Sequence, residues 1–451
     1  MKEKRNVNKR LIVLIAAVVI IISGIVIWTV SAGSGEKDPQ PDDPEVQAPA
    51  EEPPEEPPEE ESPAEEPKEP GQPAESSAGS GYAGTSYLAN TVHDVQVPAD
   101  AEKVIVEYFD VYYNSLKNLK EQDLTYLFKD PDGSEALLNQ YAISLMIQTR
   151  AMKPNDLSLA KVSYDLEFTK VSGSGSKITV TVLEDNRQNF AFMKDIQSKV
   201  YNIENTFTLE IVDGKYKISD YNKVQDFYVM FTDVYKNGGE QELKKIKDNY
   251  ISLINKKLTE DRADYNEFLN SGGYSQKECD HPYDRQKALA QTVWVNRRDP
   301  AWPVFSGNNC QNFASQVLYA GGIPMDYYGS ADKYLQWKCY SSSLNNAETP
   351  QGLVYTWTYV PYFYTYARDN TGYGLCADVD VNLYYAQAGD VIHVGSTAPT
   401  RHALVVVGDY KVNGKTVDIL VSSNTVDLEN YPMSAYSYPY SRLIKVYGWN
   451  D

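Results

Sequence analysis

The chain has 451 residues, which is enough for two or three domains. It carries 62 acidic against 42 basic residues and a net charge of −20, and this acidic balance argues against a nucleic-acid partner. The sequence contains no P-loop, no dinucleotide-binding glycine motif and no zinc-type cysteine spacing. We therefore expect neither a cofactor nor a metal.

Residues 1–10 form a basic cytoplasmic tail, with five Lys or Arg side chains against one glutamate. The next twenty residues, 11–30, carry no charge, and a helix of that length crosses a bilayer. Because basic flanks stay in the cytoplasm, we predict a single-pass protein of the cell membrane whose C-terminal domains are extracellular. A small-residue site near Ala32 leaves a cleaved signal peptide, and hence a secreted protein, as the alternative.

Residues 31–93 are predicted to form a disordered spacer. Within it, residues 32–75 hold sixteen acidic residues, two lysines and twelve prolines. Proline blocks helix and sheet while like charges repel, so this segment cannot build a core. In polyproline geometry it reaches on the order of 100 Å, enough to carry a folded domain from a membrane into a thick wall.

The region 94–226 shows helical periodicity first and strand alternation later, which predicts an α+β accessory domain. One helix is expected to start near Ala99, and another to have Ser134 as its cap. A strand is expected at 177–182 and a hairpin at the Asp-Gly turn 213–214. This order of elements, rather than any motif, resembles that of NTF2-like domains.

A connecting helical region, 227–279, follows the accessory domain. It is rich in Glu, Lys and Asp and carries a narrow apolar stripe through 240–268. That stripe predicts a long solvated helix that packs on one neighbour. The remaining residues, 280–451, form the last domain.

Cys310 lies in the most informative segment of the chain, residues 307–322. A small polar turn ends in this cysteine, and an amphipathic helix with apolar pairs four residues apart runs from it to a glycine pair. Asn309 can cap the first turn, which leaves the thiol at the positive end of the helix dipole. That environment favours the thiolate, which is the nucleophilic form of cysteine.

A base for this thiol is expected in His402, which lies 92 residues further on (402 minus 310). Asn424 follows it, and the order cysteine, histidine, asparagine is that of papain-like nucleophile systems. His393 is a rival base, but it lies inside a predicted strand whereas His402 opens the next one. Asp427 is an alternative to Asn424 as the residue that orients the imidazole.

The other cysteines lack such a setting. Cys339 has neither a helix start nor a nearby histidine, so a structural role is expected for it. If Cys310 is free, the remaining three cannot all pair; a Cys339–Cys376 disulfide is compatible with an exported chain, although sequence cannot place it. The dense aromatic residues from 355 to 366 are expected mainly to pack, with a substrate groove as the alternative.

Four motifs of the last domain occur together. They are Tyr-Asp-Arg at 283–285, Cys-Gln-Asn-Phe-Ala-Ser-Gln at 310–316, Tyr-Ala-Gly-Gly at 319–322 and Gly-Asp-Val at 389–391. With these motifs the region 280–451 resembles the putative amidase domain family of exported bacterial proteins, which is related to the NlpC/P60 and CHAP hydrolases. The resemblance implies a papain-like α+β fold in which Cys310 is the nucleophile, His402 the base and Asn424 the orienter.

Two residues depart from the pattern of that family. Asn309 stands where the family usually has aspartate, and Asn424 stands where it commonly has histidine. Asparagine caps a helix as well as aspartate does. An asparagine oxygen can also accept the imidazole N–H, as in papain-like proteases, so neither departure removes a needed function.

These features together predict an exported, membrane-tethered cysteine hydrolase of amide bonds. Attack by Cys310 forms a thioester, His402 delivers a proton to the leaving amine, and the Cys310 backbone amide donates to the oxyanion. Because the domain is expected outside the membrane on a long spacer, peptidoglycan is the expected substrate. The alternatives are a non-catalytic envelope protein that binds wall or partner proteins and an acyltransferase that uses the same thioester.

Overall fold

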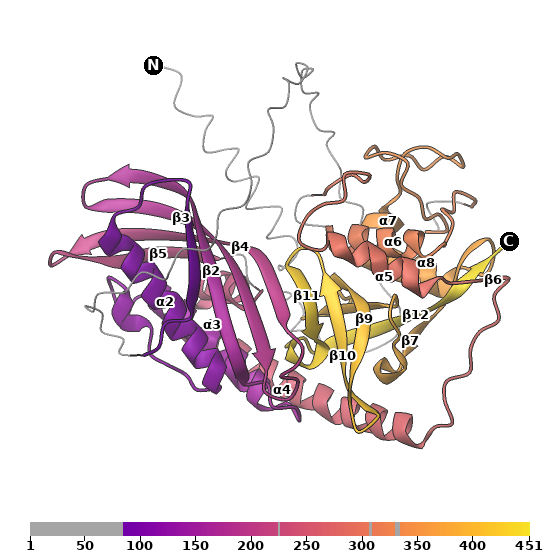
Figure 1. Ribbon diagram of the computed structural model, residues 1–451, viewed down its shortest axis with the longest axis horizontal. Coiled ribbons are helices and arrows are strands. Elements are labelled where there is room, and N and C mark those ends of the chain that lie inside the picture. The colour runs from indigo at the N-terminus through magenta and orange to yellow at the C-terminus, as the bar shows by residue number, and fades with distance from the viewer. Residues whose placement is uncertain (1–83, 224–225, 306–308, 330–333) are drawn as a thin grey trace, which may run out of the picture.

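The computed structural model describes residues 84–223, 226–305, 309–329 and 334–451 (Figure 1). The predicted transmembrane segment, 11–30, and most of the predicted spacer lie outside these residues. Across the ranges that are described, no helix is both long and apolar enough to cross a membrane.

The accessory domain packs two helices against one face of a sheet in which all strand pairs except β1–β2 are antiparallel. Its elements are β1 (Leu88–His93), α2 (Ala99–Asn118), α3 (Ser134–Ala151), β2 (Leu159–Ser174), β3 (Lys177–Phe190), β4 (Ser198–Val212) and β5 (Lys215–Lys223). The alternating burial of β3 puts one face against the helices, as a half-buried strand requires. The predicted α+β class is therefore confirmed for this region.

Most local predictions for the accessory domain are confirmed, and two are wrong. The helix at Ala99 and the hairpin at 213–214 are present, with Asp213 and Gly214 both at positive φ. Ser134 is not a cap, because the N-cap position of α3 falls on Gly133. Strand β1 lies within the region predicted as spacer: it lacks apolar alternation and owes its order to parallel pairing with β2.

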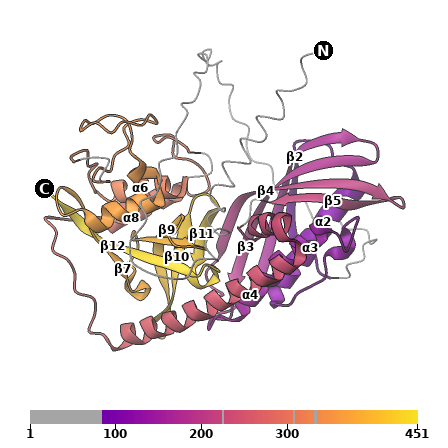
Figure 2. The same ribbon diagram turned by 180° about the vertical axis from the view of Figure 1, so that it is seen from behind.

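Helix α4 (Asp226–Asn270) connects the two domains and runs beneath both of them (Figure 2). It breaks at Gly239, whose φ of +64° is non-helical and tolerated by glycine. Beyond the break, Leu243, Tyr250 and Ile254 are buried in the core that the two domains share, and the Tyr250 hydroxyl donates to the Ser437 carbonyl of the C-terminal domain. The apolar stripe predicted for 240–268 is thus the packed face of a helix.

The C-terminal domain places helices against an antiparallel sheet. Its helices are α5 (Arg285–Gln291), α6 (Asn309–Ala320), α7 (Tyr355–Thr358) and α8 (Val360–Asp369). Its strands are β6 (His281–Pro282), β7 (Gly374–Val381), β8 (Val391–Gly395), β9 (His402–Val412), β10 (Lys415–Ser423), β11 (Asp427–Pro432) and β12 (Tyr440–Asn450).

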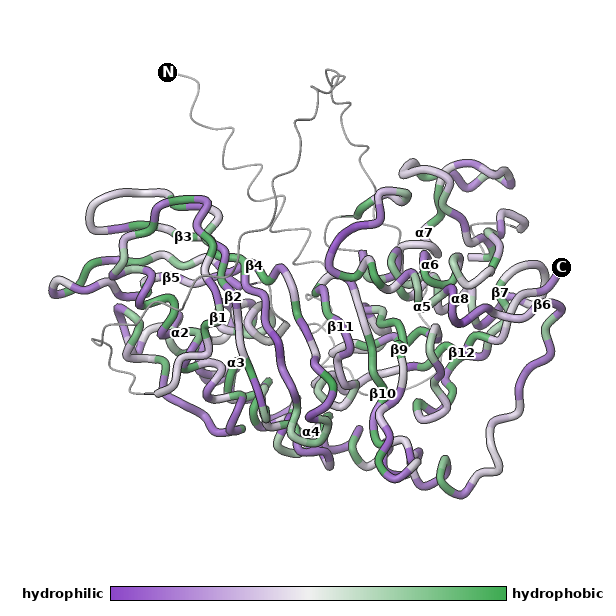
Figure 3. Tube along the Cα trace, in the orientation of Figure 1, coloured by the Kyte–Doolittle hydropathy of each residue, from purple (hydrophilic) through white to green (hydrophobic). Residues whose placement is uncertain are grey.

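One continuous sheet joins the two domains. Strand β11 pairs antiparallel with the first part of β4, with Asp427, Leu428 and Glu429 opposite Tyr201, Val200 and Lys199. The core of the accessory domain continues into the C-terminal domain through Leu404 and Val406, and apolar residues occur along β9 and β10 (Figure 3). A second core lies between the C-terminal helices and the other face of that sheet. The two domains are therefore fused through both backbone pairing and a shared core.

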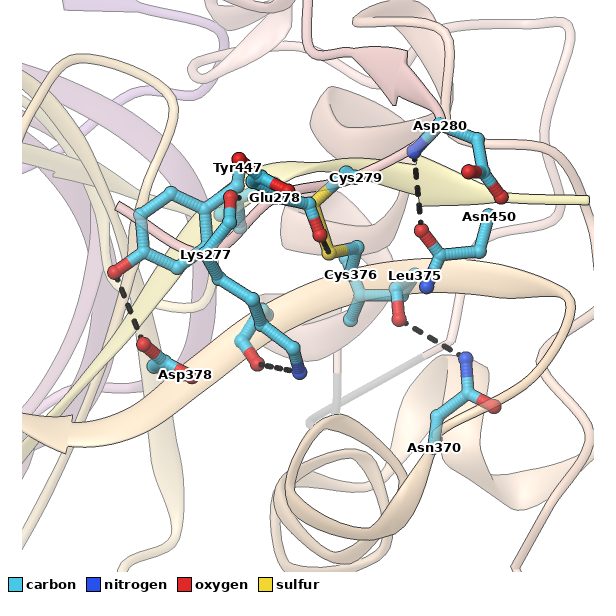
Figure 4. Close-up of a disulfide and its surroundings, with 12 residues drawn as sticks. Lys277, Glu278, Cys279, Asp280, Asn370, Leu375, Cys376, Asp378, Tyr447 and Asn450 are labelled. Carbon is cyan, nitrogen blue, oxygen red and sulfur yellow. Dashed lines mark hydrogen bonds between the residues drawn. A yellow bond between two sulfur atoms is a disulfide. The ribbon is translucent and has the colours of Figure 1, made fainter. Parts of the chain in front are cut away.

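A disulfide joins Cys279 to Cys376, with Cα atoms 6.2 Å apart (Figure 4). It ties the segment before β6 to β7, and both of these strands pair with β12. The Cys339–Cys376 pairing considered from sequence is therefore wrong. Cys339 is a free, buried cysteine, as its expected structural role requires.

Candidate active site

Helix α6 carries Cys310 in its first turn. Phe313, Ala314, Val317 and Leu318 are all buried in the core between helices and sheet, which fixes the helix against β9. Cys310 itself is a free cysteine with 7% of its surface exposed. The amphipathic pattern of the sequence thus positions the thiol at the junction of helix and sheet.

The environment of Cys310 differs from the expected one. Burial raises the pKa of the Cys310 thiol, while the backbone N–H groups of Ala403, Gln311 and Cys310 itself act in the opposite direction. Burial is the larger effect, so the resting thiol is neutral. The prediction of a resting thiolate is not met, because the helix start lies inside the core rather than at an exposed, positively charged surface.

The start of α6 is held by side chains of the 424–425 segment rather than by a cap. The Asn309 side chain donates through Nδ2 to Asn424 Oδ1 at 2.5 Å, and its Oδ1 accepts from the Phe305 backbone N–H at 3.1 Å. The Asn309 backbone N–H donates to Thr425 Oγ1 at 3.1 Å. Asn309 is thus the first residue of the helix, and the predicted cap is wrong.

His402 opens β9, and the next residue, Ala403, turns its backbone N–H toward the Cys310 sulfur. The predicted nucleophile and base therefore belong to adjacent elements. No hydrogen bond joins their side chains in the described part of the chain. His402 is half-buried, and burial lowers its pKa to about 4.

Ser423 is the residue that contacts the His402 ring. Its Oγ lies 3.3 Å from His402 Nε2 and donates to the Val426 carbonyl at 3.0 Å. Since the hydroxyl proton is used on Val426, the serine oxygen accepts from an Nε2–H, which assigns the tautomer in which Nδ1 is basic. Sequence reasoning missed Ser423, although it directly precedes the asparagine that was singled out.

Asn424 and Asp427 lie elsewhere in the site. The Asn424 amide accepts from Asn309 and donates to the Val295 carbonyl at 2.9 Å. The expected Asn424–His402 hydrogen bond is therefore not formed among the described residues. Asp427 instead pairs with Arg298, at 3.1 Å for each of two N–H···O contacts.

The rival base, His393, is fully buried on β8. Its Nε2 lies 2.9 Å from Gln311 Oε1, while its Nδ1 is buried with no hydrogen-bond partner among the residues that the structure describes. Burial lowers the pKa of His393 to about 3, with smaller contributions from Arg442 and His402. His393 thus touches the residue after Cys310 rather than Cys310 itself.

The Tyr-Asp-Arg motif supports the site from behind. Tyr283 packs so closely on Gly321 that a Cβ at that glycine would lie 2.0 Å from the ring, and its hydroxyl donates to the Gly389 carbonyl. Asp284 caps α5 by accepting from two backbone N–H groups. The motif therefore joins the end of α6 to the turn before β8, and only glycine fits at both contacts.

Arg285 completes this support. It donates to Asp390 at 2.9 Å and to the Val446 carbonyl at 2.5 Å. Asp390 is completely buried, so pairing with Arg285 compensates the cost of its burial. The Gly-Asp-Val motif thus has a structural explanation that is independent of catalysis.

The chain also contains a cavity that lies away from Cys310. A polar cavity of about 390 Å³ opens between α4 and β7, lined among others by Lys257, Asp264, Asp380 and Arg442, and contains none of the candidate site residues. Within the ranges that the structure describes, no group of three His, Cys, Asp or Glu side chains could hold a metal ion.

Comparison with known families finds a match for the C-terminal region of the chain. The family model described as "Putative amidase domain" matches residues 282–448. The match confirms the resemblance seen in the four sequence motifs. It places α5, α6 and the strands from β7 to β11 within one family domain.

One curated bacterial protein is similar in sequence to part of this chain. The uncharacterized protein YhbB of Bacillus subtilis (strain 168) is 30% identical over 186 residues, which cover 38% of this chain and 55% of the relative. The chain thus spans about half the length of that curated relative. No activity is attached to it by name.

Two solved structures align with just over a quarter of the chain. A structure described as a putative scytalone dehydratase from Novosphingobium aromaticivorans DSM 12444 has 12% identity and a TM-score of 0.20, covering 28% of this chain and 85% of its own. The intermembrane space region of chloroplast protein ARC6 has 12% identity and a TM-score of 0.20, covering 29% and 100%. Scores this low support no conclusion.

Proposed function

We propose that the C-terminal domain is a cysteine amidase in which Cys310 is the nucleophile and His402 the base. The observation that carries this is that Cys310, in the first turn of α6, is buried in one core with Ala403, the residue that follows the predicted base on β9. The family match, which indicates amide hydrolysis, supports the reaction class. The helix-on-sheet arrangement around α6 further supports a papain-like architecture, and the two helices on the sheet β2–β5 support an NTF2-like accessory domain.

The proposed reaction begins from neutral partners. His402 Nδ1 accepts the Cys310 thiol proton as the sulfur attacks the amide carbonyl, and the carbonyl oxygen becomes an oxyanion. The backbone N–H groups of Cys310 and Ala403 donate to that oxyanion. His402 then gives its proton to the leaving amine as the C–N bond breaks, which leaves a thioester on Cys310.

Hydrolysis of the thioester completes the cycle. His402 takes a proton from water as the hydroxide adds to the thioester carbonyl, and it gives that proton to the sulfur as the C–S bond breaks, which releases a carboxylic acid and restores the Cys310 thiol and the neutral imidazole. Ser423 is the proposed orienter of His402, because it holds the Nε2–H and leaves Nδ1 for proton transfer. Asn424, the orienter expected from sequence, instead holds the start of α6.

We further propose that the enzyme is exported, tethered to the membrane and acts on peptide amide bonds of the cell wall. The Cys279–Cys376 disulfide supports an extracytoplasmic location, because such bonds persist in oxidising compartments. The uncharged run at 11–30 and the acidic, proline-rich segment after it support tethering on a long spacer. Peptidoglycan is then the abundant amide polymer within reach.

The test is product analysis with the full-length protein. Purified wall is incubated with the protein and with its Cys310→Ala and Cys339→Ala variants, and soluble products are identified by mass spectrometry. We expect new carboxyl and amino ends with the wild type and the Cys339 variant, and at least about a 10³-fold lower rate with Cys310→Ala.

The outcomes separate the rival functions. Equal product formation by Cys310→Ala contradicts a cysteine mechanism, and no product with any form favours the non-catalytic envelope protein. Products in which a second amine replaces the leaving amine identify an acyltransferase. Each result is read from the mass of the new end.

A further inference from the structure

Asp427 is the centre of a buried network beside the candidate site, with 5% of its surface exposed. Its two carboxylate oxygens accept from the two terminal nitrogens of Arg298, each at 3.1 Å. The oxygen Oδ1 also accepts from the Thr425 backbone N–H at 3.1 Å. A bidentate pair fixes orientation as well as distance, so Arg298 and the 424–426 segment are held in one geometry.

That segment holds the residue before the nucleophile. Thr425 Oγ1 accepts from the Asn309 backbone N–H, and Asn424 Oδ1 accepts from the Asn309 side chain. The first N–H groups of a helix have no partner within the helix, so these contacts fix where α6 begins. Asp427 is therefore linked to the residue before Cys310 through Thr425, and in the described ranges no hydrogen bond joins its side chain to Cys310 or His402.

Thr425 also needs such support for its backbone. Its φ is +63°, in the left-handed region that a β-branched residue strongly disfavours. A conformation of that kind persists only where the surroundings determine it. The Asp427 carboxylate helps to hold Thr425 in this conformation, because it accepts a hydrogen bond from the Thr425 N–H.

The accessory domain supplies the remaining partner of Asp427. Asn202, on β4, donates through Nδ2 to Asp427 Oδ2 at 3.2 Å and to the Asn296 carbonyl at 3.3 Å. Its own backbone N–H donates to Asp185 Oδ1 at 2.7 Å, which anchors it to the accessory sheet. The backbone pairing of Asp427 with the neighbouring Tyr201 reinforces the same junction.

We propose that Asp427 is a positioning residue for Cys310 and that the accessory domain completes the active site by holding Asp427 through Asn202. The proposal rests on the proposed amidase function, which names Cys310 as the nucleophile. In this proposal the accessory domain contributes to turnover, because the hydrogen-bond network from Asn202 through Asp427 fixes the position of the first residue of α6. The Arg298–Asp427 pair is the central element of that connection.

The test compares Asn202→Ala with Tyr201→Phe in the full-length protein carrying Cys339→Ala, so that Cys310 is the only free thiol. Tyr201→Phe is the matched control, because it removes a hydroxyl that donates to Glu429 on the same strand pair and leaves the network intact. We expect Asn202→Ala to lower kcat about tenfold with KM unchanged, since it loosens the geometry at the nucleophile. The control should keep the kcat of the parent.

Two further measurements strengthen the test. Asp427→Ala should lower kcat about 100-fold, and Asp427→Asn should recover part of that loss because its amide oxygen still accepts the Thr425 N–H. The alkylation rate of Cys310 by iodoacetamide at pH 9 should rise several-fold in Asn202→Ala and stay unchanged in Tyr201→Phe, since a loosened helix start exposes the thiol. Thermal unfolding identifies any variant that fails to fold.

The results distinguish this proposal from the proposed function. If Asn202→Ala matches Tyr201→Phe in both kcat and alkylation, the positioning role is overturned while the amidase stands. If the parent protein shows no turnover that depends on Cys310, the amidase function fails. The alkylation comparison then still decides whether the accessory domain positions Cys310.

Discussion

The core of the accessory domain and the candidate active site bury their titratable groups in opposite ways. In the accessory domain, Glu184 is completely buried and accepts from Lys223 at 3.4 Å, from Asn205 at 3.3 Å and from Tyr113. Burial acts to lower the pKa of Lys223, yet the adjacent Glu184 carboxylate outweighs it and the pKa is raised. Lys223 therefore stays charged beside its partner.

The C-terminal domain buries Cys310, His393 and His402 without an opposite charge on any of them among the described residues. Burial raises the pKa of the thiol and lowers those of both imidazoles, so all three are neutral at rest. A paired buried charge thus maintains a fold, whereas neutral titratable groups without ion partners remain available for proton transfer.

Breaking the charge pair in the accessory domain should have the largest effect. Glu184→Leu leaves Lys223 buried without its partner and should lower the free energy of unfolding by about 3–5 kcal/mol. The double variant Glu184→Leu/Lys223→Met should recover most of that loss, because it removes both charges. Urea unfolding measures both, and equal instability of the single and double variants would contradict the pairing argument.

A change of pH should reveal the opposite behaviour of His393. Its pKa is about 3 in the folded chain and has its ordinary value near 6.5 in the unfolded chain, so the unfolded chain binds more protons between these values. Stability contributed by neutral His393 is therefore complete above pH 6.5 and falls as the pH drops, by about 2 kcal/mol at pH 5.

That titration needs a control, since Asp326 and Asp418 titrate in the opposite direction. Burial raises the pKa of each carboxyl to about 6, so both contribute stability as the pH falls. The contribution of His393 is the difference in pH dependence between the wild type and His393→Gln. A pH dependence that is identical in the two proteins would show that His393 is not neutral by burial.

Removing the hydroxyl that contacts the His402 ring should have the smallest effect. Ser423→Ala frees the imidazole to change tautomer and should lower kcat about tenfold with KM unchanged. Ser423→Thr, which keeps the hydroxyl, is the matched control. Normal turnover of Ser423→Ala would overturn Ser423 as the orienter.

Sequence reasoning succeeded where local pattern decides structure. The apolar spacing predicts the helix of Cys310, and the glycine pair predicts its end. In the structure Gly322 has the left-handed φ that ends a helix. The hairpin at 213–214 follows from turn chemistry. The family of the C-terminal region was identified from four short motifs, two of which prove to hold α6, α5 and β8 together.

The predictions from sequence were wrong where a contact joins residues on different strands of the sheet. Cys339 was considered as the partner of Cys376, but β6 brings Cys279 to β7 through their common neighbour β12. Ser423 rather than Asn424 contacts His402, because Ser423 is the last residue of β10, which pairs with β9, whereas Asn424 begins the turn after it and bonds to Asn309. No local signal distinguishes these cases.

The sequence alone determined the elements, the family of the last domain and the free nucleophile candidate, since these depend on periodicity, turn residues and short motifs. Only the tertiary structure decided that one sheet fuses the domains, that Cys310 is buried and neutral, and that Asn202 reaches the network beside it. Strand partners, burial and pKa values depend on residues far apart in the chain, and folding brings these together in a way that no local pattern records.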